Sequence, residues 1–449
     1  MNRAVLRLAG LGVILCALML GALMLHVPGS HSVGSPLRTN IFVGVLVAGA
    51  AVYFLCVRLV LRNRLPASAI WIVLGVAMIM RAVLLPVPPF LSGDIFRYVW
   101  DGEVQAAGIN PYRYIPADPA LAALRTPAIY SRINRKTYAR TIYPPVAEIV
   151  FAIVTRISRT VIGMKIAMVA FEAVAVLCLL RLLAIGGLPL ERVLIYAWNP
   201  LALWAFAGNG HVDAIAIGLL ALALLCRARH RDGFAGMILG CATLVKFLPI
   251  VAAPAFLRGG RLWRPLLAGG VTLVLLYTLY SSVGLHVLGY LPGYGAEEGL
   301  DSGSGFWLLA GFSQILPLSR WVVLIYVLAA VGGFGWLAFW IARGRFRQAE
   351  NDVVTLCRDT AILAAGATII VSPHYTWYFA WLAVPCVVAP LPSVIWLSAA
   401  PVLLYLDPFQ ERFFWPSLVY LPAIALALAG LWRRQTMPRA AIAASQGNL

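Results

Sequence analysis

The chain has 449 residues, of which 62% are hydrophobic and only 12% are charged. With a mean hydropathy of +0.87, this composition excludes a soluble globular protein, because apolar runs of about 18 or more residues recur along the sequence. Runs such as 11–25 and 322–341 are continuously apolar, which favours helices that satisfy their own backbone hydrogen bonds. We therefore predict an all-α, polytopic helical membrane protein.

The formal charge of +18 comes from 35 Lys and Arg residues against 17 acidic ones. Many basic residues form short clusters beside the ends of apolar runs: Arg58, Arg62 and Arg64; Arg227, Arg229 and Arg231; Arg343, Arg345 and Arg347; Arg433 and Arg434. This pattern is typical of cytoplasmic loops under the positive-inside rule, with anionic lipid headgroups as the counter-charge. We expect membrane lipids as partners and no nucleic acid.

The seven cysteines are scattered singly along the chain. Their spacing indicates neither a metal site nor a redox motif. We predict no metal and no cofactor.

The predicted elements begin with helices near 7–26, 40–62 and 68–87. We expect the first to be an uncleaved span, because no small-x-small cleavage pattern precedes the polar stretch after it. Basic flanks place the Arg58 to Arg64 cluster in the cytoplasm, so the polar loop 88–145 faces the outside.

Two later regions are less regular. The apolar run 144–158 is short, and both a full crossing and a shallow segment that returns fit it. Region 233–257 begins and ends beside basic residues and is interrupted by Lys246 and Pro249, which favours a helical hairpin or a re-entrant pair.

The remaining spans are expected near 160–185, 190–207, 211–226, 265–285, 320–342, 355–372, 375–390, 393–407 and 415–432. The total is about 12 crossings. We predict one transmembrane domain, 1–434, with a second outer loop at 286–319. A disordered cytoplasmic tail is expected at 435–449.

The longest polar segment of the chain, Ser92 to Pro145, lies in the first outer loop. At about 55 residues it is too long for a simple connector, and such loops are usually functional. Asp94, Arg97 and Asp101 recur at helical spacing, so a helix would gather them on one side. A carboxylate there lies where the headgroup of a lipid-linked substrate would emerge. The same spacing also fits a helix cap at Asp94 and an Arg97–Asp101 ion pair.

The sequence AGNGHVDA places Asn209, His211 and Asp213 where one apolar run meets the next. Burying three such side chains unpaired is costly, which favours a wet cavity or a bound polar ligand. A helix cap with a satisfied histidine is the alternative. One His and one Asp are a weak zinc signal without further ligands.

A third group lies near the membrane: Lys246 in CATLVKFLP, and His374, Tyr375 and Tyr378 in SPHYTWYF. An ionisable residue within the membrane is a functional candidate, and Lys246 or His374 could hold a phosphate. The alternatives are snorkelling of Lys246 to a headgroup and an interfacial belt for the aromatic run.

Taken together, these segments resemble bacterial integral-membrane glycosyltransferases of the GT-C superfamily. The resemblance is carried by GDIFRYVWDGEVQAAGINPYRY followed by YPP, by NP with NGHVD, by the Lys-centred hairpin and by HYTWY. It spans residues 80 to 390 and is closest to members that use polyprenyl-phosphate-mannose. Many members have two adjacent acids in the first loop, whereas here Ser92 and Gly93 precede a lone Asp94.

The resemblance implies an inverting transfer of a sugar, with mannose as the first guess, from a polyprenyl-phosphate donor. The acceptor is a hydroxyl of a glycolipid or polysaccharide on the outer side of the cell inner (cytoplasmic) membrane. Asp94 is the implied general base, with Arg97, Lys246 and His374 as candidates for the phosphate. The other candidate substrate-binding residues are Asp101, Tyr143, Asn209, His211, Asp213, Tyr375 and Tyr378.

Two other functions stay open on the sequence. Glu148 and Glu172 fall within apolar runs, as expected in a proton-coupled transporter or a lipid flippase. A membrane acyltransferase would use His211 or His374 as its base.

Overall fold

The computed structural model describes residues 3–24, 36–257, 263–344, 352–406 and 411–436. Within these ranges every regular element is a helix or a helical turn, which confirms the predicted all-α class. In the same ranges, six helices are long and apolar enough to cross a membrane, or seven if a bent helix pair counts as one span. The chain is therefore a multi-pass membrane protein.

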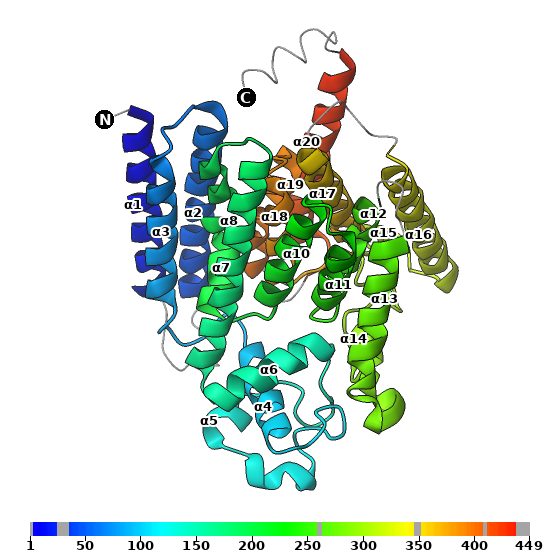
Figure 1. Cartoon of the computed structure of the whole chain (residues 1–449). Helices are drawn as coiled ribbons and strands as arrows, with labels where there is room; N and C mark the ends of the chain where they lie inside the picture. The colour runs from blue at the N-terminus through cyan, green and yellow to red at the C-terminus, as the bar shows by residue number, and fades with distance from the viewer. Residues whose placement is uncertain (1–2, 25–35, 258–262, 345–351, 407–410, 437–449) are drawn as a thin grey trace.

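The long apolar helices form an upright bundle (Figure 1). They are α1 (Arg3–Met24), α2 (Pro36–Arg62), α7 (Val161–Ile185), α16 (Arg320–Ala342), α17 (Asp352–Val371) and α20 (Phe414–Thr436). Shorter helices complete the bundle, among them α3 (Ala69–Leu84) and α10 (Asp213–Ala228). The expected total of about 12 crossings stays a prediction, because several of the expected spans are traced by short or broken helices.

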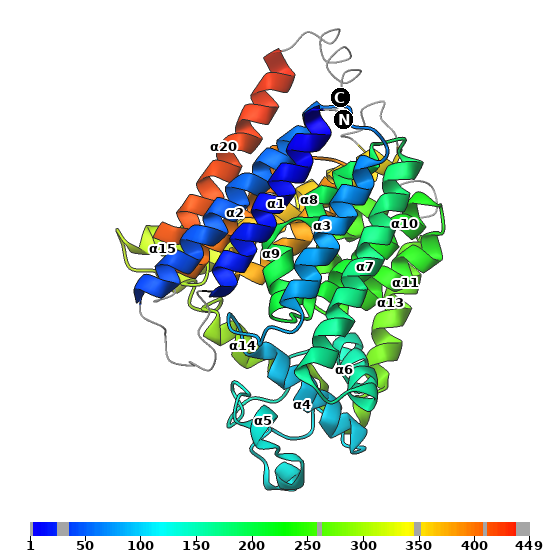
Figure 2. The same cartoon turned by 90° about the vertical axis from the view of Figure 1, so that its left-hand side faces the viewer.

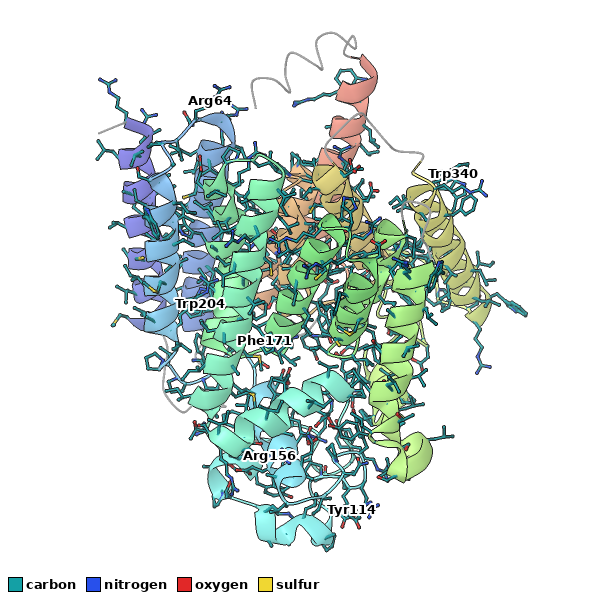
Figure 3. The ribbon with its side chains drawn as sticks, in the orientation of Figure 1. Arg64, Tyr114, Arg156, Phe171, Trp204 and Trp340 are labelled. Atoms are coloured by element: carbon teal, nitrogen blue, oxygen red, sulfur yellow. The ribbon has the colours of Figure 1, made fainter. Side chains whose placement is uncertain are left out.

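The two ends of the bundle differ. α1 begins and α20 ends at the same end of the bundle in both views (Figures 1 and 2). Arg64 lies at that end, whereas Tyr114 lies at the opposite end (Figure 3). The segment between α3 and α7, residues 85–160, therefore forms a separate layer below the bundle, which we call the loop layer.

The loop layer is built on two amphipathic helices, α4 (Asp94–Ala106) and α6 (Pro145–Ile157). Gly102 of α4 sits against α6 so closely that a Cβ atom there would come within 2.5 Å of the Phe151 carbonyl oxygen. The rings of Tyr98 and Phe151 stack at 4.7 Å. Because α6 has only 13 residues and packs in this layer, the run 144–158 is a shallow segment and not a crossing.

Residues 190–208 correct one expectation. A continuous helix is expected at 190–207, but the segment contains four short pieces: η2 (Leu190–Val193), α8 (Leu194–Ala197), α9 (Pro200–Ala202) and η3 (Leu203–Gly208), a π-helical turn. The helix breaks where Pro200 lacks a backbone N–H. Asn199 caps the new start, its Oδ1 accepting from the backbone of Leu201 at 2.9 Å.

The C-terminal expected spans 375–390 and 393–407 are broken in the same way. The first consists of η6 (Thr376–Leu382) and α18 (Ala383–Cys386), and the second of α19 (Pro392–Leu397) and η7 (Ala400–Leu406). Pro385 lies within the first run and Pro401 within the second, which explains why neither forms one continuous α-helix.

The region 233–257 forms a helical hairpin, as expected. α11 (Asp232–Thr243) leads in, and η4 (Leu248–Ala252) and α12 (Ala253–Phe256) lead back. Arg227 ties the two ends together, because it lies 3.3 Å from the Asp232 carboxylate and donates to the Phe256 carbonyl at 3.0 Å. At the other end, the Leu244 carbonyl accepts from the Val146 amide of α6 at 3.0 Å. The turn of the hairpin, residues 244–247, therefore meets the loop layer.

The predicted second outer loop follows α13 (Trp263–Thr278), which ends earlier than the expected 265–285. The chain bends by 113° between α13 and residues 281–297. The loop contains η5 (Ser281–Leu288), α14 (Leu291–Glu297) and α15 (Trp307–Ser313). It contacts the loop layer, since the Tyr290 amide donates to the Thr141 carbonyl at 3.1 Å. The expected tail, 435–449, lies almost wholly outside the described residues.

Glu172, which a transporter would need, forms a structural ion pair. Its carboxylate takes two hydrogen bonds from Arg81 of α3, at 2.7 and 3.2 Å. Arg81 also donates to the Ala197 carbonyl at 2.8 Å. Both side chains are buried, so the pair joins α3, α7 and α8 inside the bundle.

We predict that Glu172→Gln destabilises the protein, because it leaves the buried Arg81 guanidinium without its counter-charge. Breaking a buried pair on one side costs about 3–5 kcal/mol, whereas an apolar replacement of both partners is far better tolerated. Thermal unfolding in detergent should thus show a large loss for Glu172→Gln and a partial recovery for Arg81→Met combined with Glu172→Met. Equal melting temperatures for Glu172→Gln and the wild type would contradict this assignment.

Candidate active site

A cavity of about 870 Å³ lies between the loop layer and the bundle. Its walls come from the start of α4, from residues 134–144, from the hairpin at 245–251, from residues 291–300, and from the segment after α17 at 375–378. Segments far apart in the sequence therefore meet around one space. A cavity of this size with a few convergent polar groups is the usual form of a small-molecule site.

Asp94 lies at this cavity because it is the first residue of α4. Gly93 is the N-cap, and the Asp94 amide donates a hydrogen bond to Ser92 Oγ at 3.3 Å. The side-chain Oδ1 accepts from Asn134 Nδ2 at 2.8 Å. Burial raises the pKa of Asp94, and the Asn134 amide, Lys246 and Arg135 oppose this rise. The carboxylate is thus a stronger base than one in water.

Two cations line the cavity. Lys246, at the hairpin turn, lies 2.7 Å from Asp213 Oδ1 and 3.6 Å from the centre of the Tyr378 ring. Arg135 has its Nε 2.6 Å from the Glu297 carboxylate of α14. The Arg135 backbone has φ of +54°, a left-handed conformation that is uncommon outside glycine. Both cations act on the Asp94 carboxylate, so the cavity can hold an anionic group beside it.

Aromatic side chains form another wall of the cavity. The rings of Tyr375 and Trp377 stack at 4.8 Å, and the hydroxyls of Tyr294 and Tyr378 lie 2.8 Å apart. Tyr143 also lines the space. Flat ring faces and phenol hydroxyls together offer apolar contact and hydrogen bonds to a polar ring.

The remainder of the lining is apolar. Val245, Leu248 and Val251 of the hairpin line the cavity, as do Leu291 and Leu300. Such a surface suits a hydrocarbon chain better than a free sugar.

The segment between η3 and α10 lies next to Asp94. His211 is buried, and its Nδ1 lies 3.8 Å from Asp94 Oδ2. Its ring stacks on Trp377 at 4.0 Å. Asp213 is likewise buried and holds Lys246. Neither His211 nor Asp213 lines the cavity directly.

Besides His211 and Asp213, four of the expected substrate-binding residues do not line the cavity. Arg97 forms a buried ion pair with Asp101 at 2.8 Å, which is the structural alternative left open by the sequence. Asn209 accepts from the backbone amides of Phe90 and Leu91, at 3.0 and 2.9 Å.

His374 is the fourth. Its Nδ1 lies 3.1 Å from the Glu298 carboxylate, and it also contacts Arg412. This network joins the second outer loop to the segment after α17. The side chains of Arg97, Asp101 and Asn209 are thus engaged within the protein, whereas His374 Nε2 has no hydrogen-bond partner among the described residues.

Sequence reasoning missed Asn134, Arg135, Tyr294 and Trp377. Asn134 and Arg135 begin the run NRK in the first loop, and Trp377 lies in TWY. Both runs can be seen in the sequence, but residues 94 and 134 are 40 positions apart, and no periodic spacing indicates that their side chains meet.

In the residues that the structure describes, no group of three His, Cys, Asp or Glu is arranged to hold a metal ion.

The first 258 residues carry a recognisable family pattern. Residues 6–258 match the family of the alpha-(1->6)-mannopyranosyltransferase N-terminal domain. No curated protein and no solved structure matches the chain significantly. The helical bundle and its cavity define a multi-pass membrane protein with a cavity lined by polar and apolar side chains, and the matched region contains Asp94, the loop layer and the hairpin. Because the match covers more than half of the chain, the chain belongs to this mannosyltransferase family.

A second acidic side chain, Glu148, lies beside Asp101 of α4. Glu148 of α6 accepts from Thr141 Oγ1 at 2.6 Å and from Gln105 Nε2 at 2.8 Å. Burial and the nearby Asp101 carboxylate raise the pKa of Glu148 well above its ordinary value. Glu148 therefore keeps its proton to a higher pH than a glutamate in water does.

We predict that Glu148→Gln flattens the pH dependence of stability. In the folded protein Glu148 holds its proton more tightly than in the unfolded chain, so the free energy of unfolding falls as pH rises above about 4.3 toward the raised pKa. Glutamine cannot ionise, so the variant lacks this loss. Unfolding measured in detergent at pH 5 and pH 8 checks it, and parallel slopes in the two proteins would contradict the assignment.

Proposed function

We propose that the protein transfers mannose from a polyprenyl-phosphate donor to an acceptor hydroxyl with inversion, and that Asp94 is the general base. One observation carries the proposal: the Asp94 carboxylate opens into a cavity that also presents Lys246 and Arg135. A base and two cations around one space are what an alcohol and a departing phosphate require.

The reaction follows from these positions. Asp94 takes the proton of the acceptor hydroxyl as its oxygen attacks the anomeric carbon from the side opposite the phosphate. The new carbon–oxygen bond forms while the bond to the phosphate oxygen breaks, and the lipid phosphate leaves with the electron pair. Lys246 and Arg135 stabilise the charge that develops on that phosphate. Attack from the opposite side inverts the anomeric configuration.

The apolar lining supports a lipid-linked donor. A polyprenyl chain needs hydrocarbon contact next to the phosphate site, and Val245, Leu248 and Val251 supply it on the hairpin beside Lys246. The aromatic wall of Tyr375, Trp377 and Tyr378 suits the sugar. A glycolipid or a polysaccharide end is the acceptor class we expect.

The charge distribution supports an outward-facing site in the cell inner membrane. Arg64 marks the end of the bundle opposite the loop layer (Figure 3), and the Arg227 cluster follows α10 at the base of the hairpin. If these basic clusters are cytoplasmic, the loop layer and the cavity face the outside.

The two alternative functions gain no support from the geometry. Glu172 and Glu148 are both engaged inside the fold, whereas a carrier needs acids that can exchange protons with the solution. His374 pairs with Glu298, which leaves it poorly placed as the base of an acyltransferase.

We predict that Asp94→Asn abolishes mannose transfer, because the amide cannot accept the proton of the acceptor. General-base catalysis contributes about 10²- to 10⁴-fold, so the rate should fall by at least that range while donor binding remains. Membranes that contain the variant should be assayed with polyprenyl-phosphate-mannose. Asp301→Asn, an exposed residue of the second outer loop, serves as the control and keeps full activity. Substantial transfer by Asp94→Asn would overturn the proposal.

We predict that Arg135→Met weakens the donor interaction, because a charged hydrogen bond to phosphate contributes about 1.5–3 kcal/mol, or about 10- to 100-fold. Two matched variants isolate the effect. Lys136→Met removes the neighbouring cation, which packs on Tyr130 outside the cavity. Glu297→Gln breaks the Arg135 ion pair but keeps the cation. Kinetics with varied donor should show a raised KM or a lowered kcat for Arg135→Met alone, and equal losses in all three variants would count against a phosphate role.

A further inference from the structure

His211 has a buried polar side chain that makes no hydrogen bond to any described residue. Only 2% of it is exposed, and neither ring nitrogen has a hydrogen-bond partner within the described part of the chain. Buried polar atoms in native proteins are nearly always paired, so an unpaired one calls for an explanation. The Nδ1 atom of His211 lies 3.8 Å from Asp94 Oδ2.

The local backbone aims the imidazole at Asp94. Gly210 precedes His211 with φ of +70°, and a Cβ atom at Gly210 would lie 2.3 Å from Ile95 of α4. Only glycine allows this turn to pack against α4. The ring then stacks on Trp377 at 4.0 Å with an interplanar angle of 19°, which fixes the plane of the imidazole. The ring is therefore held in place although it makes no hydrogen bond.

We propose that His211 is a positioning residue, whose neutral Nδ1–H donates to Oδ2 of Asp94 while Asn134 donates to Oδ1. The inference rests on the proposed function, because it assigns the second partner of the proposed base. A distance of 3.8 Å is too long for a hydrogen bond, but hydrogen bonds of catalytic groups often shorten only when substrate is bound. The acceptor hydroxyl then approaches a carboxylate whose two oxygens each accept a hydrogen bond from the protein.

The electrostatic setting keeps the ring neutral. Burial, and next the charge of Lys246, lower the pKa of His211 well below its ordinary value. A neutral imidazole carries one N–H and one lone pair, so it can donate to Asp94 but is a poor acceptor for its proton. His211 is thus suited to orient the base and not to relay its proton.

Other groups around Asp94 act on the same ionisation. They are the cations Lys246 and Arg135, the acid Asp213, and the tyrosines Tyr98, Tyr143 and Tyr375. Burial raises the pKa of Asp94, and a donor on Oδ2 offsets that rise by stabilising the ion. Loss of this donor therefore raises the pKa of Asp94, so that a higher pH is needed to form the base.

The test compares variants of His211 through the pH profile of kcat/KM for mannose transfer. His211→Phe keeps the stack on Trp377 and removes the donor. His211→Asn keeps an N–H near the position of Nδ1, whereas His211→Gln moves the amide to the position of Nε2. His286→Phe is the matched control, since His286 is exposed on η5.

We expect His211→Phe and His211→Gln to move the acidic limb of the profile upward by about one pH unit, which is about tenfold less activity on that limb. His211→Asn should restore most of the wild-type limb, and His286→Phe should match the wild type. If His211→Phe fails to insert, the contrast between Asn and Gln carries the same test.

An acidic limb at the same pH in all variants, with a uniform loss of activity or a raised KM, would overturn the inference. Such a result would leave His211 as a packing or substrate-binding residue. The proposed function is judged separately. If Asp94→Asn is inactive and the His211 variants show no shift, the positioning role alone fails, whereas activity in Asp94→Asn removes both.

Discussion

A carboxylate at the edge of a membrane has to satisfy two opposing requirements. It has to be shielded from water, so that it is a strong base, yet its ionised form has to be stable enough to be present and accept a proton. In the proposed mechanism Asp94 meets both, because burial raises its pKa while Asn134, Lys246 and Arg135 stabilise its ion. Since these partners come from the loop layer and from the hairpin, the balance at Asp94 depends on how those two parts are joined.

That junction is built from backbone contacts and ion pairs. The Leu244 carbonyl at the turn of the hairpin accepts from α6, which brings Lys246 beside the loop layer. On the other side, Arg135 pairs with Glu297 of the second outer loop. Within the bundle, the pair of Arg81 and Glu172 joins α3 to α7. These are the two helices between which the loop layer lies in the chain. The charged groups that looked available for transport thus serve the architecture around the cavity.

Much of the fold followed from hydrophobic runs and basic flanks. The long helices, the large first loop and the hairpin around Lys246 were predicted, because each depends on local sequence. The breaks at Asn199 and Pro200 were missed, since the segment is apolar enough to suggest a span.

In the site, Lys246, Tyr143, Tyr375 and Tyr378 were predicted to be near Asp94, and they line the same cavity. Arg135 was missed, and Arg97 proved to be paired with Asp101. Which of two cations lines the cavity depends on contacts between distant segments, and spacing along the chain does not reveal them.

The most direct test is an experimental structure of the protein in a lipid nanodisc with a non-hydrolysable polyprenyl-phosphate-mannose analogue. The account predicts that the phosphate lies between Lys246 and Arg135, that the chain follows the apolar face of the hairpin, and that the anomeric carbon faces Asp94 with room for an acceptor hydroxyl. A sugar bound outside this cavity, or an Asp94 carboxylate turned away from the anomeric carbon, would contradict it.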